Sequence, residues 1–356
     1  MKQRLVPASA LIIGMMAGAA QADTAEDAAA EAAADAADRT STLERVTERE
    51  TLNCGVSTGL VGFSAPDANG VWQGFDVAMC RAVAAAVLSD PTAVEFVQTT
   101  AQTRFQALSS GEIDMLARNT TWTFSRDVGE GVNFVGVNYY DGQGFMISRD
   151  LGVSSAMELD GASVCVQTGT TTELNLADFF RANNIEYDPI PIETSAEAQQ
   201  QYLAGVCDVY STDVSALAAT RAGFGDPDAH VILPEVISKE PLGPAVRDSD
   251  TQWESIVRWT LFALIAAEEL GVTSTNVAEL AEGSDTPAIN RLLGVEGDFG
   301  EMLGLDPRWA VRAISAGGNY GEIFAANIGE ATPIGLARGL NAQWTQGGLL
   351  YAMPFR

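Results

Sequence analysis

The chain has 356 residues, of which 47% are hydrophobic and 19% charged, and its formal net charge is −27. This length and apolar content suffice for one large or two medium domains with hydrophobic cores, and they exclude a fibrous or wholly disordered chain. The acidic surface repels phosphate backbones, so no nucleic-acid partner is expected.

The first 22 residues have the pattern of a secretory signal peptide. Lys2 and Arg4 precede residues 5–19, which are apolar apart from Ser9, and Ala20-Gln21-Ala22 is a small-residue cleavage site. The alternative, an N-terminal anchor helix, is disfavoured because the apolar run is short for a membrane span. No cysteine lies at the cleavage point, so no lipid anchor is expected. The sequence therefore predicts an exported protein of the periplasm.

Residues 23–42 consist mainly of Ala, Asp and Glu. They contain no apolar stripe that a core could bury, so we expect a solvated tether.

An alternating pattern of strands and helices begins at Leu52. Short strands are expected over residues 52–57, 95–99 and 113–116, and helices over residues 77–88 and 104–109. Alternation on this scale favours parallel βαβ units.

A second run of the same kind begins near Gly161. Strands are expected over residues 163–167, 186–193 and 207–212, and helices over residues 173–182 and 195–204. Pro189 and Pro191 favour a sheet edge for their strand, because proline cannot donate a backbone hydrogen bond.

Two extended segments, residues 138–149 and 238–246, connect these α/β runs. Two crossings between two lobes suggest a hinge. From about Gln252 the chain is mostly helical and amphipathic, and it must pack back onto one of the lobes.

Six short motifs follow one another in order. They are residues 62–64 (GFS), 74–76 (GFD), 110–114 (SGEID), 119–123 (NTTWT) followed by Arg126, 167–171 (QTGTT), and Asp208 with Asp213. The set resembles the polar-amino-acid solute-binding proteins of ABC transporters. Residues 139–145 (YYDGQGF), 237–244 (ISKEPLGP) and 318–322 (GNYGE) further resemble the general L-amino-acid-binding subfamily. The resemblance covers nearly all of the chain from Thr51 to Arg356.

The resemblance implies a type II periplasmic binding protein, in which two α/β lobes joined by a two-segment hinge close on the ligand. Residues 43–142 and 245–356 would form lobe 1, and residues 143–244 lobe 2. The helical C-terminal part enlarges this protein relative to shorter family members. The implied partners are a small L-amino acid and an inner-membrane permease with its ATPase subunits, and a monomer is expected.

The ligand carboxylate is expected at Arg126, whose planar guanidinium can donate two parallel charge-assisted hydrogen bonds. The family resemblance implies an arginine at this place, whereas the alternative is an exposed arginine at a helix start. Asn119 and Thr121 lie on the same loop and could complete the polar shell. Thr170 and Thr171 open a helix whose free N–H groups favour an anion.

The ligand ammonium is expected at Asp213, directly after a strand, and the resemblance implies the same role. The alternative is a surface helix N-cap. Asp208 is expected to be structural.

The ligand side chain would meet Leu60, Phe63 and Trp72 as an apolar wall, although Phe63 could equally be plain core. Arg118, together with Arg104, could pair with a side-chain carboxylate if it reaches the pocket. The ligands expected first are Glu, Gln, Asp and Asn, in no order.

The four cysteines permit three pairings, and export makes disulfides plausible. Given the lobes that the resemblance implies, we predict Cys54–Cys80 in lobe 1 and Cys165–Cys207 in lobe 2. No metal site or cofactor is expected, because the cysteines lack CxxC spacing and His230 is the only histidine.

Two other functions remain open. Relatives on this fold include dehydratases and transglycosylases, but His230 is the only imidazole available as a base, and Arg126 and Asp213 are better explained as ligand clamps. A sensor domain is less favoured, because no signalling or membrane segment is recognisable. A binding protein, not an enzyme, is therefore expected.

Overall fold

The structure, a computed structural model, describes residues 41–356. The expected signal peptide and residues 23–40 of the expected tether lie outside the described residues. Helix α2 (Thr42–Arg49) begins at Thr42, directly after its N-cap Ser41.

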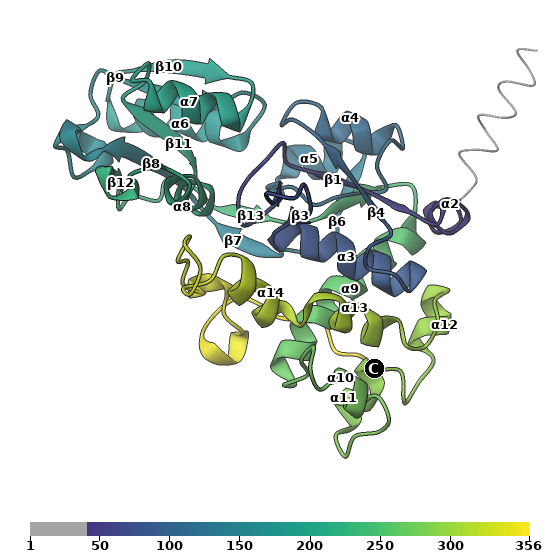
Figure 1. Cartoon of the computed structure of the whole chain (residues 1–356). Helices are drawn as coiled ribbons and strands as arrows, with labels where there is room; N and C mark the ends of the chain where they lie inside the picture. The colour runs from purple at the N-terminus through teal and green to yellow at the C-terminus, as the bar shows by residue number, and fades with distance from the viewer. Residues whose placement is uncertain (1–40) are drawn as a thin grey trace, which may run out of the picture.

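Two five-stranded sheets form the two lobes in Figure 1. The first sheet has the order β4-β1-β5-β14-β6. Its strands are β1 (Leu52–Val56), β4 (Val94–Gln98), β5 (Met115–Leu116), β6 (Val132–Phe134) and β14 (Ala245–Arg247). The three strands β4, β1 and β5 are parallel, as the βαβ pattern predicts, while β14 runs antiparallel between β5 and β6.

Helices α3 (Phe75–Leu88), α4 (Arg104–Ser109) and α5 (Phe124–Gly129) belong to the first lobe, with the small hairpin β2 (Ala65–Pro66) and β3 (Trp72–Gln73). Helix α3 is buried on almost every side, because it contacts β1 as well as helices of the C-terminal part. Its many Ala and Val side chains allow this close packing.

The second sheet has the order β10-β9-β11-β8-β12. Its strands are β8 (Gln143–Ser148), β9 (Ala162–Gln167), β10 (Tyr187–Ile192), β11 (Val209–Asp213) and β12 (His230–Ile232), and its α-helices are α6 (Thr171–Asn183), α7 (Ser195–Leu203) and α8 (Val214–Ala222). The proline-containing strand β10 lies at the edge, which confirms the expectation from Pro189 and Pro191.

A two-stranded antiparallel ribbon joins the lobes. It consists of β7 (Tyr139–Asp141) and β13 (Glu240–Leu242), with Glu240 opposite Asp141. Figure 1 shows this ribbon between the two sheets. The extended segments expected from the sequence are therefore the two crossings of the hinge.

The C-terminal part is helical and packs on the first lobe, below it in Figure 1. Its α-helices are α9 (Thr251–Glu269), α10 (Val277–Leu280), α11 (Pro287–Leu292), α12 (Phe299–Leu303), α13 (Trp309–Gly317) and α14 (Tyr320–Asn327). It also reaches the hinge. The Asn341 amide accepts a hydrogen bond from Tyr140 N and donates one to Tyr140 O, and Tyr320 Oη donates to Asn138 O.

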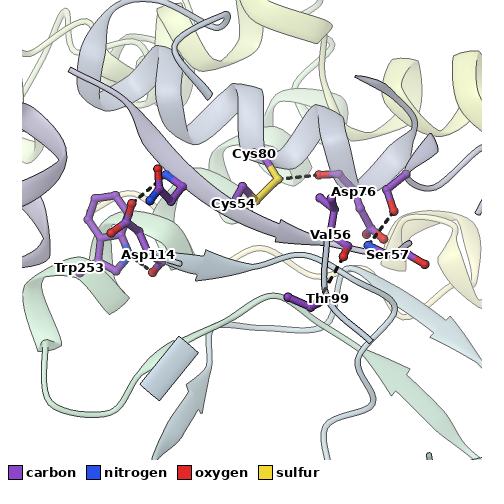
Figure 2. Close-up of a disulfide and its surroundings, with 10 residues drawn as sticks. Cys54, Val56, Ser57, Asp76, Cys80, Thr99, Asp114 and Trp253 are labelled. Carbon is purple, nitrogen blue, oxygen red and sulfur yellow. Dashed lines mark hydrogen bonds between the residues drawn. A yellow bond between two sulfur atoms is a disulfide. The ribbon is translucent and has the colours of Figure 1, made fainter. Parts of the chain in front are cut away.

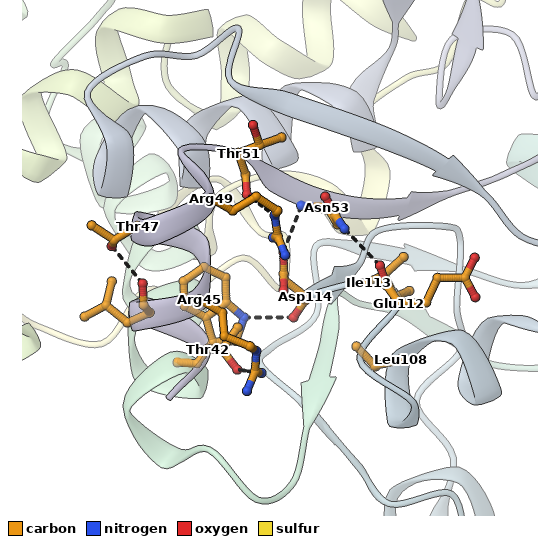
Figure 3. A network of polar contacts seen from close by, with 12 residues as sticks. Thr42, Arg45, Thr47, Arg49, Thr51, Asn53, Leu108, Glu112, Ile113 and Asp114 are labelled. Carbon is orange, nitrogen blue, oxygen red and sulfur yellow. Dashed lines mark hydrogen bonds and ion pairs between the residues drawn. The ribbon is translucent and has the colours of Figure 1, made fainter. Parts of the chain in front are cut away.

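Helix α2 is fixed to the first lobe by polar contacts, which Figure 3 shows. Arg49 forms an ion pair with the buried Asp114, which also accepts from Asn53 N at 2.8 Å. Thr42 N donates to Asp250. Helix α2 thus lies against the side of lobe 1.

Both disulfides form within a lobe, as predicted. Cys54–Cys80 joins β1 to α3 (Figure 2), and Cys165–Cys207 joins β9 to the residue two before β11. No helix within residues 41–356 is long and apolar enough to cross a membrane.

Candidate functional site

A cavity lies between the lobes, beside the hinge, with an empty volume of about 580 Å³ that includes the solvent at its mouth. Residues from both lobes line it: Ser57, Leu60, Arg104, Arg118, Asn119, Thr121, Arg126, Gln167, Thr170, Thr171, Thr172, Ser195, Tyr210, Thr212, Asp213 and Ala216. The lobes touch across the cleft. Gln102 Nε2 donates to Thr168 Oγ1 at 3.1 Å, and a Cβ on Gly169, which has φ +72°, would lie 2.9 Å from Gln102 Cγ.

Arg126 is buried at the cavity, with 8% of its surface exposed. It lies in the first turn of α5, where Thr123 caps the helix, and its Nη1 donates to Thr121 O at 2.9 Å. Its guanidinium also lies 5.5 Å from the ring centre of Phe105. These contacts fix the orientation of the guanidinium group, and its remaining N–H donors are available to a ligand.

Two further guanidinium groups surround the same cavity. Arg118 Nε donates to Thr99 O at 3.0 Å, and burial lowers its pKa to about 10. Arg104 extends toward the other lobe, with weak contacts of 3.5 Å to Thr120 Oγ1 and Gly169 O, and its Nε has no hydrogen-bond partner among residues 41–356. Burial first, and then repulsion from Arg118 and Arg126, lower the Arg104 pKa well below its usual value. Three crowded cations favour an anion in the cavity.

Asp213 lies opposite this positive charge, at the N-cap position of α8. Its side chain makes no capping hydrogen bond. Asp141 caps the helix instead, since its carboxylate accepts a hydrogen bond from Ser215 N at 3.3 Å. No hydrogen-bond donor within residues 41–356 reaches the Asp213 carboxylate. Burial, followed by the nearby Asp141 and Glu240, raises its pKa well above the usual range. A bound cation would relieve this unfavourable charge.

Asn119 and Thr121 lie on the loop after β5. Asn119 adopts φ +43°, a left-handed conformation that Asn tolerates better than most residues, and its buried Oδ1 has no partner within the described residues. The Thr121 hydroxyl donates to Glu240 at 2.6 Å and lies 3.3 Å from the Thr171 hydroxyl.

Thr170 and Thr171 lie at the start of α6. Thr170 is the N-cap, and its hydroxyl accepts from Glu173 N at 3.3 Å and donates to Gln167 O at 2.6 Å. Its side chain is thus used by the cap. Thr170, Thr171 and Thr172 line the cavity, so the N-terminus of α6 lies at the cavity, where the helix dipole favours an anion.

Leu60 lines the cavity, but Phe63 and Trp72 lie outside it. Phe63 is fully buried, in edge contacts with Phe75 and Tyr139. Trp72 packs on Phe96 at a ring distance of 5.8 Å. The expected aromatic wall is therefore wrong for this cavity, because both rings are used by the core and surface packing of lobe 1.

Several lining residues were not singled out from the sequence. They are Ser57, Gln167, Thr172, Ser195, Tyr210, Thr212 and Ala216. Apart from Tyr210, which lies within β11, they lie at strand ends or helix starts, so the pattern of strand ends and helix starts is the signal that could have found them. The sequence predicts Arg104 at the cavity only beside Arg118.

His230 lies away from the cavity. Its Nδ1 is 2.8 Å from Tyr202 Oη, and its ring packs on Phe224. No group of His, Cys, Asp and Glu side chains in the described part of the chain is arranged to hold a metal ion.

Comparisons with known proteins identify the family. The sequence profile of the bacterial extracellular solute-binding proteins, family 3, matches residues 52–275. The chain is 58% identical to the glutamate/glutamine/aspartate/asparagine-binding protein BztA of Rhodobacter capsulatus over 100% of both chains. It is 56% identical to the general L-amino acid-binding periplasmic protein AapJ of Rhizobium johnstonii, over 89% of this chain and 93% of the relative.

A solved structure agrees with these relatives. The ABC transporter periplasmic binding protein from Brucella ovis, with glutathione bound, superposes with a TM-score of 0.87 at 55% identity, over 89% of this chain and 100% of that one. The match extends across both lobes and the C-terminal part, so the fold is the two-lobed periplasmic binding protein fold. The chain belongs to the bacterial extracellular solute-binding proteins, family 3.

Proposed function

We propose that this protein is the periplasmic substrate-binding component of an amino-acid ABC transporter, and that it captures L-amino acids between its lobes. The observation that carries the proposal is the pairing, in one interlobe cavity, of three buried arginines with a buried carboxylate that no donor from residues 41–356 reaches. A free amino acid carries both complementary charges, on two groups attached to the same carbon atom, and the names of the relatives support this ligand class.

The proposed binding mode follows from the charges. Arg126 and the first amide groups of α6 hold the ligand carboxylate, and Asp213 holds the ammonium. Because binding desolvates both charged groups, each needs a hydrogen-bonding partner of opposite charge. Thr121, Thr171 and Asn119 complete the polar shell, and Leu60 covers the aliphatic part of the ligand.

The proposed ligand range includes Glu, Gln, Asp and Asn. Arg118 and Arg104 remain as positive groups after Arg126 is assigned to the main carboxylate, so they favour a side chain that ends in a carboxylate or an amide oxygen. The Rhodobacter relative is named for these four amino acids.

A second ligand class is glutamyl peptides. An open cleft continues outward from the cavity and shares Arg126, Thr170 and Thr171 with it. A longer ligand could bind its glutamyl end inside and extend into this cleft. The glutathione in the Brucella structure supports this extension of the proposal.

We propose that the protein is not an enzyme. The relatives named above are described as binding proteins, and the high pKa of Asp213 needs no catalytic explanation if an ammonium group neutralises it. The fold alone does not decide the matter, because function depends on the site.

The proposed cellular setting is the periplasm. The signal-peptide pattern and the periplasmic relative support export to the periplasm. An inner-membrane permease with its ATPases would receive the ligand, and the protein would act as a monomer. We place the lobe boundaries after residues 142 and 244, where the chain leaves the hinge ribbon.

Calorimetric titration tests the proposed function. Residues 23–356, unfolded and refolded to remove ligand from the host, are titrated with the twenty L-amino acids and with glutathione. We expect one-to-one binding that Arg126→Ala and Asp213→Ala abolish. Arg149→Ala is the matched control, because Arg149 is an exposed arginine of lobe 2 that contacts Asp228 O. Failure of every ligand to bind would refute the proposal.

A further inference from the structure

Glu240 is an almost fully buried carboxylate in the hinge strand β13, with 1% of its surface exposed. It accepts four side-chain hydrogen bonds. Oε2 accepts from Thr121 Oγ1 at 2.6 Å and Thr171 Oγ1 at 2.8 Å. Oε1 accepts from Asn175 Nδ2 at 2.7 Å and Ser238 Oγ at 2.6 Å. Such a set is what a buried carboxylate requires, since an unpaired one would be strongly destabilising.

The four donors come from three parts of the molecule. Thr121 lies on the loop between β5 and α5 of lobe 1, Thr171 and Asn175 lie on α6 of lobe 2, and Ser238 precedes β13 itself. One carboxylate therefore ties both lobes to the hinge. Separation of the lobes would pull Thr121 and Thr171 apart, so they could not both stay on Oε2.

Glu240 also determines how two cavity hydroxyls are oriented. A threonine hydroxyl has one hydrogen and two lone pairs. Because Thr121 and Thr171 both donate that hydrogen to Glu240, each can only accept a hydrogen bond from a ligand. Both line the cavity, whereas Glu240 does not. Its hydrogen bonds reach the cavity through these two threonines, and its charge also acts on Arg126 and Asp213.

We propose that Glu240 is a closure latch: it stabilises the state in which the lobes touch, and it positions the Thr121 and Thr171 hydroxyls as acceptors for the cationic end of the ligand. The ligand part of this inference rests on the proposed function. The latch part concerns only the balance between open and closed lobes, which ligand binding shifts toward closed. Glu240 is a positioning residue, because it does not touch the ligand.

The first test compares Glu240→Gln with Glu235→Gln. Glu235 is a matched control, since its carboxylate also accepts two short hydrogen bonds, from Ser155 Oγ and Ala156 N, but entirely within lobe 2. Glutamine retains the shape and cannot accept from all four donors. We expect Glu240→Gln to weaken L-glutamate binding about 10- to 100-fold, mainly through faster dissociation, and Glu235→Gln to change it less than about twofold. Equal affinities in wild type and Glu240→Gln would overturn the inference.

A second variant covers the case in which Glu240→Gln fails to fold. Asn175→Ala removes one lobe 2 donor without altering the inner cavity, because Asn175 lies only in the outer cleft. We expect about 3- to 10-fold weaker binding with only a small decrease in melting temperature, because Glu240 keeps three of its four donors. Wild-type affinity in this variant would refute the latch.

The lobe distance separates this inference from the proposed function. Spin labels at Ser109→Cys and Ala177→Cys, exposed sites on opposite lobes, report the distance, and all four native cysteines are paired in disulfides. In ligand-free protein, Glu240→Gln should shift the distribution to longer distances, even if no amino acid binds the wild type. An unchanged distribution would exclude the latch while leaving the proposed function intact.

Discussion

The replacement of Asp213 by asparagine should weaken ligand binding and stabilise the ligand-free protein. The Asp213 carboxylate is buried, lacks a donor among the described residues, and lies near Asp141 and Glu240, which together raise its pKa. Its charge is therefore unfavourable until an ammonium group arrives. Loss of one partner of a buried charge pair costs about 2–5 kcal/mol, or roughly 30-fold to several thousand-fold in dissociation constant.

The stability effect has a defined sign. A folded pKa above the unfolded value means that the folded state binds more protons, so stability falls as pH rises above the ordinary aspartate range. Asp213→Asn removes this loss. The melting temperature of the ligand-free variant should therefore exceed that of the wild type at pH 7.5, and the difference should shrink toward pH 4.

Titration calorimetry with L-glutamate and scanning calorimetry without ligand measure the two effects. Asp208→Asn is the control, because Asp208 lies near the start of the same strand and accepts hydrogen bonds from Ser163 N and Oγ that lower its pKa. It should lose a little stability and keep its affinity. An Asp213→Asn protein with lower stability, or with wild-type affinity, would show that the carboxylate is structural.

Three further predictions concern Arg118, the Cys54–Cys80 disulfide and the buried Asp76. Arg118→Gln should reduce affinity for L-glutamate more than for L-glutamine, because it removes a cation that favours a side-chain carboxylate; equal losses in calorimetric titrations would show that Arg118 does not distinguish them. Cys54→Ser with Cys80→Ser should lower the free energy of unfolding by roughly 3–4 kcal/mol in denaturant titrations, since the cross-link spans 26 residues; no change would contradict this. Burial raises the Asp76 pKa to about 7. The free energy of unfolding of Asp76→Asn should therefore increase relative to wild type as pH rises from about 4 to about 7, by at most about 4 kcal/mol. A difference that does not depend on pH would show that the Asp76 charge does not destabilise the folded protein.

The sequence could predict those features that depend on neighbours in the chain. The parallel strands, the prolines at the sheet edge and the two extended crossings all follow from local patterns. Arg126 and Asp213 could be assigned to the cleft because the resemblance to the polar-amino-acid solute-binding proteins implies an arginine and a carboxylate at these positions.

Features that depend on distant contacts could not be predicted in this way. Phe63 has an aromatic side chain beside a glycine-rich loop, which suits a pocket wall, but Tyr139 and Phe75 enclose it in the core. Glu240 belonged to a recognisable motif, yet its partners Thr121 and Thr171 lie 119 and 69 residues away. Only the folded hinge brings them together.

The placement of the two disulfides has a consequence for the energetics of capture. Each cross-link joins elements of one sheet or of a sheet and its helix, so relative motion of the lobes leaves both intact. Each lobe therefore moves as a rigid body, and the conformational change is concentrated in the ribbon of β7 and β13. Ligand binding then costs little conformational entropy within either lobe, so more of the interaction free energy stabilises the closed arrangement of the two lobes.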